Sequence, residues 1–164
     1  MQLAKRRGTI SIFNAYLYLF IYFFFAICAF ETEKMEHLLV ESTSHTPYIS
    51  FNSELGVMEI KGRSIPEQAD DFWLPVLNWF ESYVQMPAKQ TIFRIDLEYF
   101  NISSSKRILF LLYKLNNLAK ITESVKVEWY YREDDEDMYE VGNDYAYMVK
   151  VPFDFIMYKE PEFA

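Results

Sequence analysis

The stretch TIFRIDLEYFNISSSK, residues 91–106, decides the fold because it contains a strand, a junction and the start of a helix. Over residues 91–100, apolar and charged side chains alternate. One face of the predicted strand carries Phe93, Ile95, Leu97 and Tyr99. The other face carries Arg94, Asp96 and Glu98. This alternation is typical of a strand with one face in the core and one face in water.

The junction after this strand places small hydroxyl residues at the beginning of a helix. A helix N-terminus leaves backbone N–H groups without partners and has a partial positive charge, so it stabilises an anion such as a phosphate. Ser103 and Ser104 are therefore candidate phosphorylation sites, with Lys106 close by as a cation. The alternative is simple capping, in which a side-chain oxygen of Asn101 or Ser103 accepts a hydrogen bond from one of those N–H groups.

Two segments have the period of an amphipathic helix. After the junction, a helix is predicted to about residue 120, with its apolar stripe at Ile108, Leu111, Leu112, Leu115 and Leu118. Between Pro66 and Tyr83 the same period is set by Trp73, Val76, Leu77, Phe80 and Val84. Pro75 falls inside this second segment, so we expect the helix either to start near Leu74 or to be kinked.

The remaining segments predict four more strands and one more helix. We expect strands at residues 48–51, 57–61, 125–131 and 153–157, and a helix at residues 135–149. The predicted order is β-β-α-β-α-β-α-β, in an α/β fold. Because the strands alternate instead of being apolar throughout, one sheet face is expected to be solvated, with the helices packed mainly on the other.

Residues 1–34 differ in character from the rest of the chain. A basic run at residues 5–7 precedes an almost unbroken apolar run at residues 10–30. That length is enough to span a bilayer as a helix or to form the core of a signal peptide. One interpretation is a membrane anchor; the other is that translation starts at Met35 and that the preceding residues are upstream sequence. In both cases we expect the folded domain to comprise residues 35–164.

Charge and cysteine content exclude several classes of function. The chain has a net charge of −8, and residues 1–34 contain four basic and two acidic residues, so residues 35–164 carry −10. Such a domain repels nucleic acid and anionic lipid, so we expect no nucleic-acid partner. The single cysteine, Cys28, lies in the apolar run. Disulfide bonds, cysteine zinc sites and thiol catalysis are therefore excluded for residues 35–164.

The sequence contains no conventional catalytic set. His37 and His45 both precede the first predicted strand, and there is no glycine-rich phosphate loop, serine elbow or histidine pair at metal-ligand spacing. The acidic run at residues 133–137 lacks the alternating ligands and the glycine of a calcium loop. Carboxylates there suit the first turn of a helix. We therefore expect no catalytic residue, no metal and no cofactor.

A series of positions along residues 46–158 has a distinctive order and spacing. They are Thr46, Pro47, Gly62, Arg63, Ser64, Pro66, Glu67, Phe72, Pro75, Trp79, Tyr99, Phe100, Asn101, Ser103, Ser104, Lys106, Trp129, Tyr130, Asp135, Gly142, Val151, Pro152 and Phe153. In this order they resemble the SiaC family of bacterial regulatory phosphoproteins. The fold of that family is similar to that of anti-sigma-factor antagonist (STAS) domains, which the resemblance therefore implies here.

The resemblance implies a non-enzymatic switch in cyclic di-GMP signalling. A protein kinase would phosphorylate a hydroxyl at the strand-to-helix junction, a phosphatase would remove the phosphate, and the unmodified form would bind and activate a diguanylate cyclase. The docking surface would include Tyr99, Asn101, Ile102, Ser103, Ser104 and Lys106. The family begins a few residues before its Thr-Pro pair, near Met35, which favours Met35 as the start and the cytoplasm as the location.

One position departs from the family pattern. The phosphoacceptor of the family is a threonine directly after the junction asparagine, and here that position is Ile102, which has no hydroxyl. Either the acceptor has moved to Ser103 or Ser104, with Ser103 preferred, or this member binds its partner without a phosphorylation switch. An alternative from another class is a membrane-tethered adaptor that uses residues 10–30 as its anchor.

Overall fold

One six-stranded sheet organises the computed structural model, which describes residues 35–122 and 124–159. Its strands and helices are β1 (Leu38–Val40), β2 (Tyr48–Asn52), β3 (Val57–Ser64), α2 (Ala69–Tyr83), β4 (Thr91–Phe100), α3 (Ile102–Leu118), β5 (Val125–Arg132), α4 (Glu136–Met148) and β6 (Phe153–Tyr158). The predicted anchor at residues 10–30 lies outside the described residues. Within the described ranges, no helix has the length and apolar character needed to cross a membrane.

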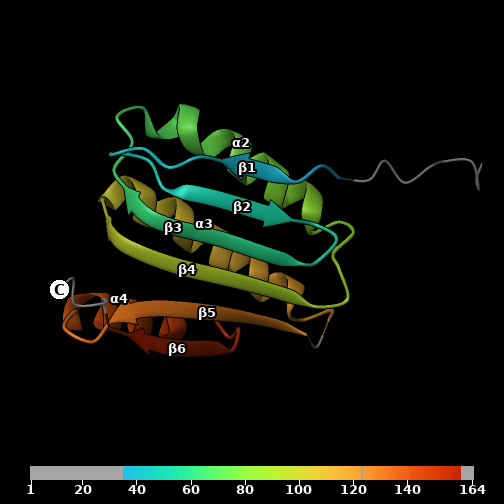
Figure 1. Cartoon of the computed structure of the whole chain (residues 1–164). Helices are drawn as coiled ribbons and strands as arrows, with labels where there is room; N and C mark the ends of the chain where they lie inside the picture. The colour runs from blue at the N-terminus through green and yellow to red at the C-terminus, as the bar shows by residue number, and fades with distance from the viewer. Residues whose placement is uncertain (1–34, 123, 160–164) are drawn as a thin grey trace, which may run out of the picture. The chain divides into compact units, whose positions relative to one another are not determined.

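The spatial order of the strands follows the sequence, from β1 to β6. The first three strands pair antiparallel, and β3 to β6 pair parallel. Each of α2, α3 and α4 connects one parallel strand to its next neighbour. Because such crossovers are right-handed and all step in one direction, the helices lie on one face of the sheet, as Figure 1 shows. The α/β fold and its single helix-covered face are therefore confirmed.

The core lies between the sheet and the helices and is rich in aromatic rings. Phe51, Phe80 and Phe93 are fully buried. Their rings meet edge to face, with centroids 5.9 to 6.2 Å apart. Under α4, Gly142 lets the indole of Trp129 approach so closely that an added Cβ would lie 2.6 Å from its Nε1 atom. Burying each such side chain contributes about 1.5–3 kcal/mol to the free energy of unfolding. The apolar sheet face that the sequence alternation predicts therefore stabilises the packing of the helices on the sheet.

One strand and one helix start differ from the sequence prediction. The strand β1 was not predicted, because three residues are too few to show an alternation. Of the two alternatives predicted for the segment around Pro75, a helix start near Leu74 is wrong, since α2 begins at Ala69 and contains Pro75. Pro75 has no backbone N–H to donate to the carbonyl of Asp71. Both residues are exposed, so water can donate a hydrogen bond to that carbonyl instead.

A register shift in β4 changes which side chain faces the core. The pairing of β3 with β4 slips between Gly62, which has φ +96°, and Arg63. Beyond this bulge, Phe100 turns toward the helices and stacks on Tyr145 at 6.4 Å. Tyr99 is 51% exposed beneath the Arg63 guanidinium, 5.3 Å from its ring centroid. The prediction that Tyr99 shares the buried face is therefore wrong, because an inserted residue breaks the alternation.

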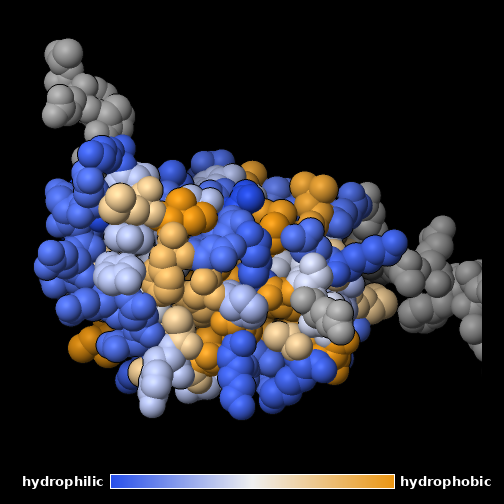
Figure 2. Space-filling model, turned by 90° about the horizontal axis from the view of Figure 1, so that it is seen from below, coloured by the Kyte–Doolittle hydropathy of each residue, from blue (hydrophilic) through white to orange (hydrophobic). Residues whose placement is uncertain are grey.

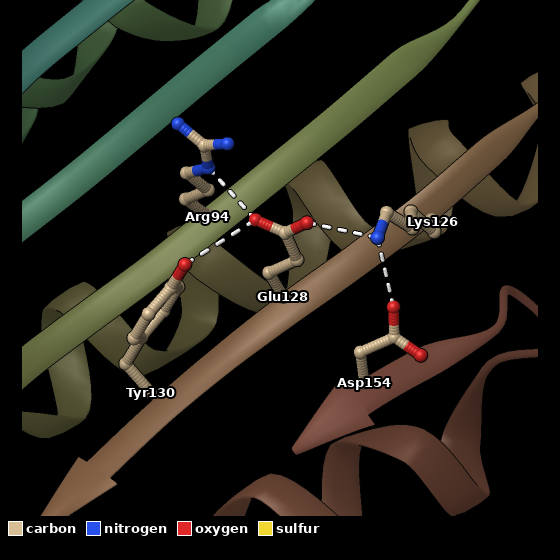
Figure 3. A network of polar contacts seen from close by, with 5 residues as sticks. All are labelled: Arg94, Lys126, Glu128, Tyr130 and Asp154. Atoms are coloured by element: carbon tan, nitrogen blue, oxygen red, sulfur yellow. Dashed lines mark hydrogen bonds and ion pairs between the residues drawn. The ribbon is translucent and has the colours of Figure 1, made fainter. Parts of the chain in front are cut away.

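The sheet face opposite α2, α3 and α4 carries a charge network centred on Glu128 (Figure 3). The buried Glu128 carboxylate accepts hydrogen bonds from Arg94 Nε at 2.7 Å, Lys126 Nζ at 2.8 Å and the Tyr130 hydroxyl at 3.4 Å. Lys126 also pairs with Asp154 at 2.9 Å. Burial acts to raise the pKa of Glu128, but the hydrogen bonds and charges of Lys126 and Arg94 outweigh burial and lower that pKa below 4.5.

This network predicts an acid-dependent loss of stability. Since the pKa of Glu128 is depressed in the folded state, its contribution is present above about pH 4.5 and is lost as the pH falls through the folded-state pKa. We expect Glu128→Gln to lower the free energy of unfolding by about 1–3 kcal/mol near neutral pH. The difference in free energy of unfolding between Glu128→Gln and wild type should become smaller as the pH falls from neutral to acidic. Urea unfolding at a series of pH values measures this difference.

The matched control is Glu59→Gln, which removes the same charge from a half-buried residue opposite Arg94 in the β3–β4 register. It should change the free energy of unfolding by less than about 1 kcal/mol at every pH, since surface charge changes are usually small. A gap between Glu128→Gln and wild type that stays constant from neutral to acidic pH would contradict the assignment of the pKa shift to this network.

Candidate functional site at the start of helix α3

The strand-to-helix junction is closed by Asn101. This residue is the N-cap of α3, with φ −85° and ψ 171°, and its Oδ1 accepts a hydrogen bond from the Ser104 backbone N–H at 2.9 Å. Its own backbone N–H donates to the Ser64 carbonyl at 3.1 Å. Of the two capping residues considered from the sequence, the structure uses Asn101. The cap fixes the first turn of α3 against the end of β3.

Ser104 points into the core. Its side chain is fully buried, and its Oγ accepts hydrogen bonds from the Ser64 hydroxyl at 2.8 Å and from the Trp73 indole N–H at 3.3 Å. These contacts join the end of β3 and the start of α3 to α2. A hydroxyl in this position is out of reach of a modifying enzyme while the protein is folded. The burial of this hydroxyl argues against Ser104 as the acceptor.

Ser103 lies one residue earlier on the helix and faces α2. Its side chain is half-buried, and its Oγ accepts a hydrogen bond from Arg107 Nη1 at 3.0 Å. The same nitrogen donates to the Ser103 carbonyl at 3.0 Å. The other terminal nitrogen of Arg107 forms an ion pair with Asp70 in the first turn of α2. A hydroxyl, a guanidinium and a carboxylate therefore meet between α2 and α3.

Ser105 faces α4. Its Oγ is 2.7 Å from the hydroxyl oxygen of Tyr145, which is buried. Burial raises the pKa of the Tyr145 hydroxyl, so this group stays neutral and available as a donor. Successive residues of a helix are turned by about 100°. For that reason three adjacent serines contact three different neighbours, and only Ser103 combines partial exposure with a cation.

The outermost residues of the junction are Ile102 and Lys106. Ile102 is 77% exposed, and Lys106, four residues later on the same side of the helix, is exposed as well. Asn101 and Ser103 lie next to them. Tyr99 is exposed too, but on the open face of the sheet. The predicted docking residues thus divide into a group at the start of α3, a separate tyrosine on the sheet and the buried Ser104.

Sequence reasoning missed Arg107 and Asp70. Arg107 follows Ser103 by four residues, a spacing at which helical side chains meet, so this contact was available from the sequence. Asp70 belongs to a helix 37 residues away in sequence, and no local pattern links it to Arg107. The same holds for Ser64 and Trp73, whose contacts with Ser104 arise only from the packing of α2 and α3 on the sheet.

Comparison with known proteins identifies the family. Residues 40–158 match the model of the SiaC family regulatory phosphoproteins. This chain belongs to the SiaC family. A curated, uncharacterized protein of Pseudomonas aeruginosa is 24% identical over 119 residues, which cover 73% of this chain and 94% of that protein.

Solved structures share the SiaC fold. A chain in the crystal structure of diguanylate cyclase SiaD in complex with its activator SiaC, from Pseudomonas aeruginosa, matches with a TM-score of 0.70 at 23% identity. The match covers 74% of this chain and 99% of that chain. Apo-SiaC of Pseudomonas aeruginosa matches with a TM-score of 0.67 at 24% identity, again over 74% of this chain and 99% of the other. The fold expected from the SiaC resemblance is therefore confirmed.

The contrast between Ser103 and Ser104 gives a direct stability test. Ser104→Asp places an unpaired carboxylate in the core and should lower the free energy of unfolding by more than about 3 kcal/mol. Ser103→Asp places the same carboxylate beside Arg107 at a helix N-terminus and should change it by less than about 1 kcal/mol. Urea unfolding monitored by circular dichroism measures both. Equal destabilisation by the two variants would contradict the assigned side-chain directions.

Proposed function

We propose that this protein is a non-enzymatic regulator that binds a diguanylate cyclase through a surface at the start of α3, and that phosphate on Ser103 controls the binding. Membership of the SiaC family supports a regulatory role. The diguanylate cyclase is proposed because SiaC of Pseudomonas aeruginosa is the activator of diguanylate cyclase SiaD. The observation that carries the switch is the contact of Ser103 with Arg107, which itself pairs with Asp70.

The charges around Ser103 explain how a phosphate could act. A phosphate adds about −1.5 to −2 charges and three strong acceptor oxygens. Arg107 already donates to Ser103 Oγ and would be drawn further toward the phosphate. Asp70 would then lose its ion-pair partner and face an added negative charge. Modification would therefore weaken the contact between α2 and α3 while changing the charge of the surface beside Ile102.

The neighbouring residues are poorer acceptors for physical reasons. Ile102 occupies the position where the SiaC resemblance implies a threonine acceptor, but it has no hydroxyl. Ser104 is buried, and the Ser105 hydroxyl is engaged with Tyr145. Ser103 is half-buried and faces a cation, so it is the acceptor we propose. A protein kinase and a phosphatase are the partners that this switch requires.

The switch is tested by the binding of two Ser103 variants to the diguanylate cyclases of the source organism. Ser103→Asp should weaken binding about tenfold or more. A fixed carboxylate would repel acidic groups of the partner, and it would lose its hydration against apolar groups of the partner. Ser103→Ala should bind like wild type. Isothermal titration calorimetry measures the affinities, and cyclic di-GMP production measures activation.

The matched control is Ser124→Asp, which adds the same charge to an exposed serine just before β5. In this parallel part of the sheet, residues that precede strands lie at the opposite end from the start of α3. Ser124→Asp should leave the affinity unchanged. Equal affinity of Ser103→Asp and Ser103→Ala would reject the switch, and phosphosite mapping that finds only other residues would reject Ser103 as the acceptor.

We also propose a cytoplasmic location, because cyclic di-GMP signalling partners would have to meet the protein there. The alternative is anchoring through residues 10–30. Mass spectrometry of the native N-terminus separates these locations. We expect a chain that begins at Met35, whereas an intact residue 1 recovered from the membrane fraction would support the anchor and overturn the proposal.

A further inference from the structure

The first turn of α2 begins without a capping side chain. Its N-cap residue, Gln68, makes no side-chain hydrogen bond to the helix. In contrast, the side chains of Asn101 and Asp135 cap α3 and α4, each by accepting a hydrogen bond from a backbone N–H of the first turn. A cap of this kind stabilises the start of a helix because it satisfies an N–H that has no partner within the helix. The first turn of α2, residues 69–72, therefore lacks a hydrogen bond that the other two helix starts have.

Pro75 weakens the connection between this turn and the rest of α2. In an α-helix, each backbone N–H donates to the carbonyl four residues earlier. Pro75 has no N–H, so the carbonyl of Asp71 accepts no hydrogen bond of this kind. The N–H of Phe72 donates to the Gln68 carbonyl at 3.2 Å. The hydrogen bonds between the start of α2 and the following turn are therefore interrupted at Asp71.

Trp73 is the first residue of α2 that is fixed in the core. Its side chain is fully buried, and its indole N–H donates to Ser104 Oγ at 3.3 Å. Before Trp73, Asp70 and Asp71 are exposed and Phe72 is half-buried. Local opening occurs where few apolar groups are buried and backbone hydrogen bonds are exposed. Residues 68–72, which we call the opening segment, can therefore detach while Trp73 holds the rest of α2 on the sheet.

An ion pair with α3 holds the opening segment from outside. Arg107 pairs with Asp70, and this is the one ion pair of the opening segment among the residues that the structure describes. The Arg107 side chain is 22% exposed, whereas that of Asp70 is 88% exposed. Arg107 also donates to Ser103 Oγ at 3.0 Å. One guanidinium thus serves both the opening segment and the hydroxyl of Ser103.

We propose that the Arg107–Asp70 ion pair holds the opening segment against α3, and that phosphate on Ser103 releases it. The release rests on the proposed function, because it requires Ser103 to be the acceptor. A phosphate would form charge-assisted hydrogen bonds with Arg107 in place of Asp70. Its negative charges would also repel the carboxylates of Asp70 and Asp71. Phosphorylation would therefore remove the attraction that holds the segment and add a repulsion that opens it.

The release would change the shape of the surface beside the start of α3. The ring of Phe72 meets the Trp73 ring edge to face, with centroids 5.4 Å apart. Because Phe72 belongs to the opening segment, release would take it out of this contact. Ordering and disordering of a short segment by a phosphate is an established kind of protein switch. A partner that docks on the closed segment would lose that contact in the phosphorylated protein.

Hydrogen exchange measured by nuclear magnetic resonance tests the release. Protein with phosphoserine incorporated at position 103 should exchange the amides of Phe72, Trp73 and Leu74 about threefold or more faster than unmodified protein. The reference amides are those of α4 and β6, on the side of the molecule that Figure 2 views, and their rates should stay the same. Unchanged rates at the three amides, or an equal increase along all of α2, would overturn the proposal.

Two matched variants test the ion pair without phosphate. Asp70→Asn removes the carboxylate that pairs with Arg107. Asp71→Asn removes the same charge from the same turn, but Asp71 has no ion pair within the described ranges. Asp70→Asn should speed exchange at Phe72 and Trp73 at least about twofold more than Asp71→Asn does. Equal effects of the two variants would overturn the role of the ion pair.

A second control uses the other ion pair between the same helices. Lys114 on α3 pairs with Glu81 in the last turn of α2. Lys114→Gln breaks that pair far from the opening segment, so the exchange rates at Phe72 and Trp73 should not change. An increase as large as that in Asp70→Asn would overturn the proposal, because the loosening would then not be local to the first turn.

Exchange and binding together separate this proposal from the proposed function. The affinities of Ser103→Asp and Ser103→Ala for the diguanylate cyclases test whether charge at Ser103 controls binding. Weaker binding of Ser103→Asp with unchanged exchange in the phosphoserine protein would overturn the release alone. Faster exchange in the phosphoserine protein with equal affinities of the two variants would support the release and overturn the proposed control of binding.

Discussion

The buried hydroxyl of Ser104 is the contact on which the geometry of the junction depends. It accepts hydrogen bonds from Ser64 at the end of β3 and from Trp73 on α2, so one oxygen atom joins three elements. A buried polar group without partners costs about 1–3 kcal/mol, so these elements are held together by the need to satisfy it. Once Ser104 points inward, the rotation of the helix leaves Ser103 facing α2 and Ile102 facing water.

The strand order imposes the second constraint. Because β3 to β6 follow one another in space, α2, α3 and α4 cover one face, and the other face must be compatible with water. The network around Glu128 meets this requirement with two acidic and two basic residues that neutralise each other. Compensated charges of this kind favour stability and leave little for a partner to bind. The start of α3 differs from this network, because its outermost residue, Ile102, is apolar and 77% exposed.

The core positions that depend on local periodicity could be predicted from the sequence. The alternation over residues 91–97 placed Phe93 and Ile95 in the core, and the period of the following helix placed Ile108 and Leu112 there as well. Contacts between distant segments escaped prediction, since Asp70 and Arg107 meet only because two helices pack on one sheet. Local interruptions escaped for a different reason. The sequence keeps alternating through Tyr99, but the bulge turns that side chain outward in the structure, and β1 is too short to show a period.

The resemblance to the SiaC family implies a threonine acceptor at the position of Ile102, and the isoleucine found there changes what a phosphate could do in this protein. A phosphate at position 102 would project into water, because that side chain is 77% exposed. It would act on a partner by charge alone. At Ser103, the proposed acceptor, the helix turns the group by about 100° toward Arg107 and Asp70. Modification there would reach a partner both through the charge of the surface and through the position of α2, so the shift of one residue couples the switch to the packing of the domain.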